Sequence, residues 1–134
     1  MGFRTVLRSE FDHLSVLDAM QGFDDPRKNY EMAAELLASH DDLKGIYSVG
    51  SGNRGIEKAL LESGRNDEVT YIAFNLTPLT TQCLLSGVMD AVMHQDMARA
   101  ADVAISAVVD SAAGRPARFD NIPIEIIMRE SIRE

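Results

Sequence analysis

Residues 45–60 join an apolar strand, a glycine-rich turn and the start of a helix, and this junction constrains the fold more than any other segment. The pattern predicts a strand over residues 45–49 and a helix over residues 53–63, with glycines spaced G-x-G-x-x-G at the turn. In open α/β sheets, ligands bind beyond the carboxyl ends of the strands, where glycines let backbone N–H groups approach a ligand closely. A helix N-terminus adds partial positive charge there. The junction therefore predicts an α/β protein with a ligand site at one edge of its sheet.

Strand and helix patterns alternate along the rest of the chain. Strands are predicted over residues 14–21, 45–49, 69–74, 91–94 and 122–128, and helices over residues 3–11, 29–39, 53–63, 78–86 and 96–113. Strands separated by helices imply parallel crossovers. The predicted fold class is α/β, a Rossmann-like and mostly parallel sheet with flanking helices, formed by residues 1–134 as one unit.

The composition limits the function classes that fit this chain. A formal net charge of −8 argues against nucleic-acid binding by these residues, because a phosphate backbone attracts clustered Lys and Arg. No apolar stretch is long enough for a bilayer span, so no membrane partner is expected. The single cysteine, Cys83, excludes an internal disulfide and fits a reducing compartment, and a periplasmic protein with a lone cysteine stays open.

Polar side chains follow three of the predicted strands where each strand ends. Ser51 and Asn53 follow the strand over residues 45–49, Asn75 follows the next strand, and Gln95 follows the one after it. Amide groups both donate and accept hydrogen bonds, as a ligand with many hydroxyls requires. The convergence of these side chains predicts a binding site for such a ligand.

Neither a metal site nor a catalytic site is predicted. His94 has no second His or Cys at ligand spacing, and no Ser-His-Asp arrangement or pair of carboxylates occurs at the strand ends. No cofactor is expected, and the chain is predicted to be a binding protein rather than an enzyme.

A dinucleotide-binding function stays open as a less favoured alternative. Gly50, Gly52 and Gly55 match the spacing of the fingerprint that binds a pyrophosphate. That fingerprint also needs an acidic residue at the end of the next strand to hold the ribose, and Asn75 occupies this place.

The order and spacing of short motifs along almost the whole chain resemble those of one protein family. The motifs are Gly2-Phe3, Asp24-Asp25, Leu36-Leu37, His40, Gly45-Ile46-Tyr47, Gly55, Ala59-Leu60, Gly64, Phe74-Asn75-Leu76-Thr77-Pro78 and Gln95-Asp96. Together they resemble the C-terminal half of type I periplasmic-binding-protein-like domains. This group includes sugar-binding proteins and the effector domains of LacI-family transcription regulators.

The resemblance implies that this chain is the C-terminal lobe of a two-lobed domain, without its N-terminal lobe and the strand before Gly2-Phe3. It implies that Asn75 takes the place where relatives commonly use an Asp to hold a sugar hydroxyl, and that Gln95 matches a glutamine beside the hinge. Ser51 and Asn53 lie in the loop that replaces the usual Asn-Asp pair of the family.

Two functions follow from this resemblance. The first is a cytoplasmic LacI-type regulator, in which a sugar or polyol effector controls DNA binding by closing the lobes; DNA would be contacted only through an N-terminal headpiece that is absent here. The run Ile126-Ile127-Met128-Arg129-Glu130-Ser131-Ile132 resembles the tails of such regulators and favours this interpretation. The alternative is a periplasmic sugar-binding protein of an ABC transporter.

Self-association is also expected. If the strand before the first helix is missing, the strands over residues 14–21 and 45–49 keep unpaired edges that invite pairing with another chain. In the helix over residues 96–113, apolar positions such as Ile105 and Val108 would lack the lobe against which they pack.

Overall fold

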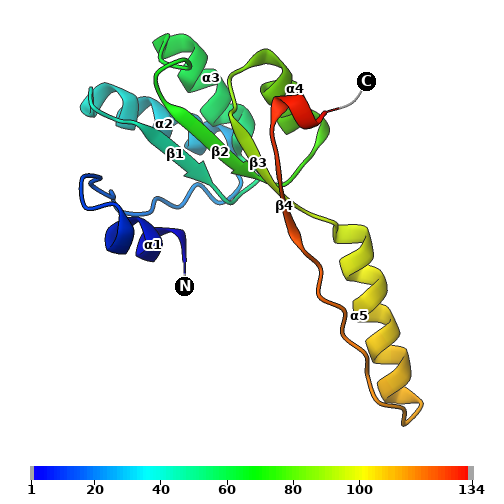
Figure 1. Cartoon of the computed structure of the whole chain (residues 1–134). Helices are drawn as coiled ribbons and strands as arrows, with labels where there is room; N and C mark the ends of the chain where they lie inside the picture. The colour runs from blue at the N-terminus through cyan, green and yellow to red at the C-terminus, as the bar shows by residue number, and fades with distance from the viewer. Residues whose placement is uncertain (1, 133–134) are drawn as a thin grey trace.

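The computed structural model describes residues 2–132 as an α/β fold with four strands and five α-helices (Figure 1). In chain order the elements are α1 (Phe3–Glu10), α2 (Pro26–Ser39), β1 (Gly45–Ser48), α3 (Asn53–Ser63), β2 (Thr70–Phe74), α4 (Pro78–Ser86), β3 (Ala91–Gln95), α5 (Met97–Ala112), β4 (Ile124–Ile127) and a short 3-10 helix (Arg129–Ser131). The predicted fold class is confirmed.

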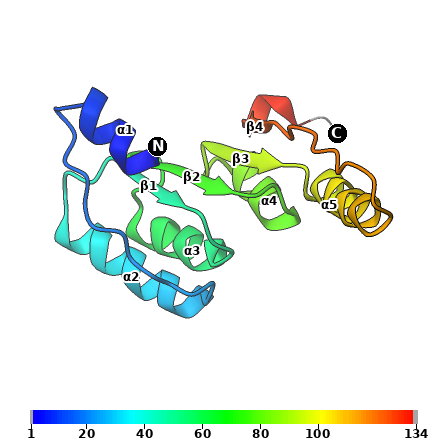
Figure 2. The ribbon, with the colours of Figure 1, turned by 90° about the horizontal axis from the view of Figure 1, so that it is seen from below.

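The sheet has the order β1-β2-β3-β4, so strands that follow one another in sequence lie side by side. The first three strands are parallel, whereas β4 pairs with β3 in the antiparallel direction. Helices α2 and α3 cover one face of this sheet, and α1 lies on the opposite face (Figure 2). The mostly parallel sheet with helices on both faces is therefore as predicted.

Several helices begin or end at a capping residue that the local sequence provides. Asp25 caps α2 by accepting hydrogen bonds from the backbone N–H groups of Arg27 and Lys28, and Pro26 occupies the first turn. At the C-terminus of α3, Gly64 adopts φ 67°, a left-handed conformation that glycine reaches without steric cost. These helix boundaries follow from short-range chemistry that the sequence shows directly.

The core lies between the sheet and the helices α2, α3 and α4. Its largest fully buried side chains are Tyr71, Leu60, Leu84, Met89, Val69 and Val92. Close approach of α2 to α3 depends on Gly55, because a Cβ at this position would lie 1.9 Å from the backbone oxygen of Pro26. This glycine lets the two helices pack against each other without an intervening side chain.

The strand predicted over residues 14–21 is wrong. This segment runs extended but pairs with no strand in the described part of the chain, and Leu17 and Met20 remain 39% and 44% exposed. A strand requires ladder hydrogen bonds to a neighbour, and hydrophobic alternation cannot show whether a neighbour exists. As a consequence β1 is an edge strand.

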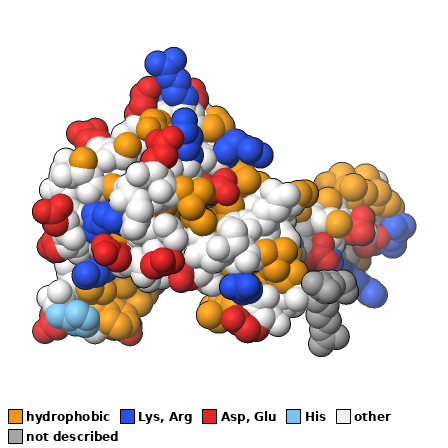
Figure 3. Space-filling model, turned by 90° about the horizontal axis from the view of Figure 1, so that it is seen from above, with side chains coloured by type: hydrophobic (Ala, Val, Ile, Leu, Met, Phe, Trp, Pro, Cys, Tyr) orange, Lys and Arg blue, Asp and Glu red, His pale blue; other side chains and the backbone are white. Residues whose placement is uncertain are grey.

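Helix α5 and the run that returns from it project away from the sheet (Figure 1). Hydrophobic side chains gather over this projecting arm, seen at the right of the space-filling view (Figure 3). On α5, Ile105 is 63% exposed and Val108 is 68% exposed, and Phe119 in the returning run is 79% exposed. Although α5 is apolar, no helix within residues 2–132 combines the length and hydropathy needed to cross a bilayer.

We expect the substitution Gly55→Ala to destabilise the fold by about 1–3 kcal/mol, because the added methyl group overlaps backbone atoms that cannot rotate away. The matched control is Gly45→Ala, where the nearest atom to a new Cβ is a backbone oxygen at 3.4 Å. Urea unfolding followed by circular dichroism measures both variants. Equal stability of the two variants would contradict the packing role of Gly55.

Candidate functional site

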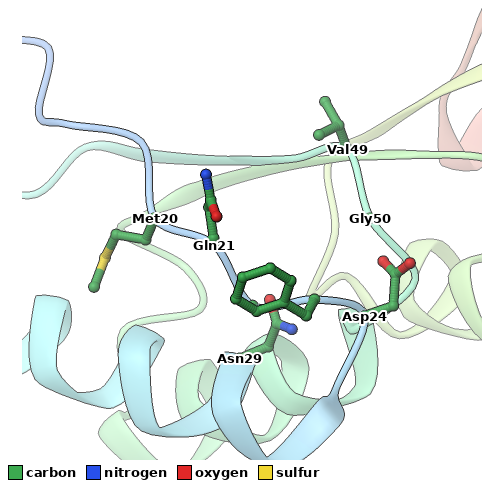
Figure 4. A pocket seen from close by; sticks show the side chains of 8 residues that line it. Met20, Gln21, Asp24, Asn29, Val49 and Gly50 are labelled. Atoms are coloured by element: carbon green, nitrogen blue, oxygen red, sulfur yellow. The ribbon is translucent and has the colours of Figure 1, made fainter.

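The carboxyl ends of β1, β2 and β3 meet at one edge of the sheet and carry the predicted polar residues in the loops that follow them. A hollow of about 280 Å³ lies beside the end of β1, lined by Met20, Gln21, Gly22, Phe23, Asp24, Asn29, Val49 and Gly50. In Figure 4, Met20 and Gln21 border this hollow on one side, and Val49 and Gly50 border it on the other. The site is therefore an open edge where several loops converge.

A tight turn at Phe23 and Asp24 shapes one wall of the hollow. Both residues have positive φ angles, 51° and 58°, which non-glycine residues adopt rarely. Asp24 Oδ1 accepts a hydrogen bond from the backbone N–H of Ser51 at 2.7 Å, and this bond joins the turn to the loop after β1. The turn leaves the Phe23 ring 74% exposed, with Lys28 Nζ 5.2 Å from the ring centroid.

Sequence reasoning identified neither Phe23 nor Asp24 as part of the site. Asp24-Asp25 is noted in the sequence only as one of the motifs that resemble the family, and in the structure Asp25 caps α2. The contact between Asp24 and Ser51 spans 27 positions, and no local pattern shows a contact at that separation. The one available signal was an aromatic residue beside a glycine and two aspartates in a predicted loop.

Asn53 turns its side chain into the core. It is 4% exposed, and its Oδ1 accepts a hydrogen bond of 2.8 Å from the hydroxyl of Tyr71 on β2. Burial raises the pKa of Tyr71 above its ordinary value, so the hydroxyl stays protonated and acts as the donor. In this arrangement Asn53 holds the start of α3 against the sheet.

Both the oxygen and the nitrogen of the Asn75 side-chain amide form hydrogen bonds within the protein. Its Oδ1 accepts hydrogen bonds from the backbone N–H groups of Leu76 and Gln95, at 2.8 and 3.2 Å, and also contacts Nδ1 of His94. Its Nδ2 donates to the backbone oxygen of Gln95 at 3.1 Å. Asn75 thus ties the end of β2 to the end of β3.

Ser51 and Gln95 have side chains that are free to meet a ligand. Ser51 is exposed and Gln95 is partly exposed, and neither side chain makes a hydrogen bond to another residue within residues 2–132. The structure therefore places all four predicted residues at the same edge but with different surroundings. Ligand contact remains a prediction for each of them.

Gly50, Gly52 and Gly55, which match the spacing of the dinucleotide fingerprint, each allow another protein segment to approach closely. A Cβ at Gly50 would lie 2.5 Å from Oδ1 of Asp24, and a Cβ at Gly52 would lie 2.1 Å from Nδ2 of Asn29. Gly55 is the contact point of α2 and α3 described above. The glycines therefore permit close contact between protein segments, and their spacing does not require a bound pyrophosphate to explain it.

No group of three or more His, Cys, Asp or Glu side chains that could hold a metal ion occurs in the part of the chain that the structure describes. Cys83 is buried, and burial raises the pKa of its thiol to about 12. The thiol is therefore protonated at neutral pH, which agrees with a packing role for this residue.

We expect Tyr71→Phe to lower the free energy of unfolding by about 1–3 kcal/mol, because it leaves Oδ1 of Asn53 buried without a donor. Tyr30→Phe is the matched control, since the Tyr30 hydroxyl bonds to Glu62 on the exposed surface. Denaturant unfolding of both variants measures the difference. A loss no greater than that of the Tyr30 variant would show that the buried hydrogen bond is unimportant.

We expect Asn75→Ala to cost a similar amount, about 1–3 kcal/mol, because the backbone groups of Leu76 and Gln95 lose their partners together. Asn66→Ala removes a hydrogen bond to its exposed neighbour Asp67 and serves as the control. Thermal unfolding measures the melting temperatures of the two variants, and we expect the lower value for Asn75→Ala. If the Asn75 variant has the same melting temperature as the wild type, the hydrogen bonds of Asn75 do not hold the strand ends together.

Comparison with known proteins places this arrangement in a family. Residues 1–116 match the family model described as "Periplasmic binding protein domain". No curated protein matches the chain.

Solved structures share the fold at low sequence identity. The glucose-galactose binding protein GanP from Geobacillus stearothermophilus is 20% identical, with a TM-score of 0.89 over 98% of this chain and 47% of that one. A carbohydrate transporter solute binding protein from Agrobacterium radiobacter, in complex with D-arabinose, is 17% identical, with a TM-score of 0.87 over 96% of this chain and 44% of that one. An ABC transporter solute binding protein from Agrobacterium vitis with bound D-fucose is 14% identical, with a TM-score of 0.87 over the same shares, 96% and 44%.

This chain spans about half the length of the solved structures that it matches. The family and these neighbours are binding proteins rather than enzymes, in agreement with the function class predicted from the sequence. The match over residues 1–116 shows that the chain belongs to the periplasmic binding protein domain family.

Proposed function

We propose that residues 1–134 form one lobe of a two-lobed sugar-binding domain and contact a monosaccharide at the carboxyl edge of the sheet. The observation that carries this proposal is the hollow beside Phe23, in a chain of this family, with the free side chain of Ser51 in the neighbouring loop. The neighbours that hold D-arabinose and D-fucose support a sugar as the ligand class.

The chemistry of the edge suits a sugar because it combines an aromatic ring with hydrogen-bonding groups. A sugar ring has apolar C–H faces and a rim of hydroxyls, so it packs on an exposed aromatic such as Phe23 while its hydroxyls exchange hydrogen bonds with hydroxyl and amide groups. Ser51 and Gln95 provide such groups. Asn53 and Asn75 would act mainly by holding the loops in place, since their side chains already bond within the protein.

A sugar-binding protein of a transport system is the intact protein that we favour. The neighbours include ABC transporter solute binding proteins and a sugar-binding protein of a sugar ABC transporter, which supports this choice over the regulator expected first. In such a protein the second lobe would close over the ligand and bury most of its surface.

A LacI-type regulator is the second proposal, and it rests on the resemblance of residues 126–132 to regulator tails. Closure of the lobes around an effector would then change DNA affinity through a headpiece outside residues 1–134, provided that the effector binds the two states unequally. The DNA sequence upstream of the Met1 codon distinguishes the two proposals. An in-phase helix-turn-helix favours the regulator and a cytoplasmic location, whereas an in-phase secretion signal favours the transport protein.

We expect D-arabinose, D-fucose or D-galactose to shift amide resonances of the 134-residue chain only at residues 20–24, 49–53, 75–77 and 95–96 in an NMR titration. Affinity will be weak, because one lobe covers only part of a ligand that such sites normally enclose. NADH tests the dinucleotide alternative in the same experiment. Shifts caused by NADH alone would contradict the sugar proposal.

Two variants test the side chains involved. Phe23→Ala and Ser51→Ala should each raise the Kd for the sugar, obtained from the concentration dependence of the shifts, by about tenfold or more, corresponding to a loss of about 1.4 kcal/mol. Ser86→Ala, at the end of α4 near the opposite edge of the sheet, is the matched control and should bind like the wild type. Unchanged binding by both edge variants would place the sugar elsewhere.

A further inference from the structure

His94 lies at the carboxyl end of β3, beside the junction that Asn75 forms between β2 and β3. It is two residues from the fully buried Val92, so both side chains lie on the same face of the sheet. His94 is partly buried, and its Nδ1 contacts Oδ1 of Asn75. His94 belongs to no metal-binding group within residues 2–132, so this contact is the role that its surroundings indicate.

The surroundings of Asn75 decide which way its side-chain amide faces. Oδ1 accepts hydrogen bonds from the backbone N–H groups of Leu76 and Gln95, and Nδ2 donates to the backbone oxygen of Gln95. If the amide turned over, Nδ2 would face these two donors and Oδ1 would face the oxygen of Gln95. The main chain is fixed as well, because Thr80 Oγ1 donates to the backbone oxygen of Asn75 at 2.9 Å. Only the observed orientation gives every group a partner.

This orientation determines the tautomer of His94. An amide oxygen can only accept, so the nitrogen of His94 that contacts Oδ1 must carry a proton. A neutral imidazole has a single N–H, which leaves Nε2 without a proton. A proton on Nε2 instead could serve the exposed carboxylate of Glu125, which lies opposite His94 in the pairing of β3 with β4. That tautomer would leave the Nδ1 lone pair against Oδ1 of Asn75.

The contact reaches the ligand edge through the backbone of Gln95. Both backbone groups of Gln95 bond to the Asn75 amide, whereas its side chain makes no hydrogen bond to another residue within residues 2–132. The orientation of the Asn75 amide therefore sets the position from which the free side chain of Gln95 extends.

We propose that His94 is a positioning residue of the carboxyl edge, and that its neutral Nδ1–H tautomer fixes the amide of Asn75 and thereby the backbone at Gln95. The effect of His94 on a ligand rests on the proposed function, since it assumes that Gln95 contacts a sugar. The tautomer and the hydrogen bonds of Asn75 require no sugar. Failure of this contact and failure of sugar binding are thus separate results.

The tautomer is measured directly by the ¹⁵N chemical shifts of the imidazole nitrogens in the 134-residue chain. In alkaline buffer, where free imidazoles are neutral, we expect a protonated Nδ1 and an unprotonated Nε2 at His94. The exposed His13 is the internal control, and its shifts should be averages over both tautomers. A proton on Nε2 of His94, or averaged shifts like those of His13, would overturn the proposal.

His94→Asn and His94→Gln test the contact as a matched pair. The Asn amide nitrogen is as many bonds from Cα as Nδ1 of histidine, whereas the Gln nitrogen is one bond further, as Nε2 is. In hydrogen–deuterium exchange we expect His94→Asn to keep the wild-type rates of the Leu76 and Gln95 amides. His94→Gln should raise both rates about tenfold, because loss of the contact increases the population of open amides.

His40→Gln, the same substitution at the end of α2, is the control and should leave both rates unchanged. Rescue by asparagine separates the contact from a general packing role, which the larger glutamine would fill at least as well. Equal exchange rates in the two His94 variants would therefore overturn the proposal.

Titration with D-arabinose, D-fucose and D-galactose tests the link to the ligand. We expect His94→Gln to raise the Kd of a bound sugar, His94→Asn to leave it unchanged, and the effect of His94→Gln to vanish in the Asn75→Ala background, because His94 acts through Asn75. An effect that persists without the Asn75 amide would overturn this route. A wild-type chain that binds none of the three sugars contradicts the proposed function, while the tautomer and exchange results still decide the contact.

Discussion

The side chain of Asn75 holds together the ends of β2 and β3 at the carboxyl edge of the sheet. Its amide satisfies both backbone groups of Gln95 and the N–H of Leu76, at a point where the ladder between β2 and β3 has already ended. Without it these groups would need water, and the loops after the two strands would be free to separate. Asn75 therefore fixes the loops after β2 and β3 relative to each other.

The same requirement explains why the polar residues at this edge do not all keep their side chains free. A buried amide must find a partner, and Asn53 finds one in the hydroxyl of Tyr71 behind the edge. The turn at Phe23 and Asp24 likewise supplies a hydrogen-bond partner, because Asp24 Oδ1 accepts from the backbone N–H of Ser51. Amides that looked equivalent in the sequence therefore divide into those that support the loops and those that remain free.

Two surfaces of the molecule are apolar and exposed for related reasons. The projecting arm formed by α5 and its return, and the extended run over residues 14–21, both expose large hydrophobic side chains that a folded domain normally covers. Within residues 2–132, α5 leaves the sheet and residues 14–21 pair with no strand, so neither has a neighbour that covers these side chains.

The sequence by itself determined the α/β class, the three parallel strands and most helix boundaries, because hydrophobic periodicity and caps such as Asp25 and Gly64 act over a few residues. It also brought Ser51, Asn53, Asn75 and Gln95 to one edge, because parallel strands end on the same side. Only the tertiary structure decided that residues 14–21 form no strand, that Asn53 and Asn75 bond within the protein, and that Phe23 borders the hollow. Each of these depends on a partner distant in sequence, present or missing, and local patterns carry no information about such partners.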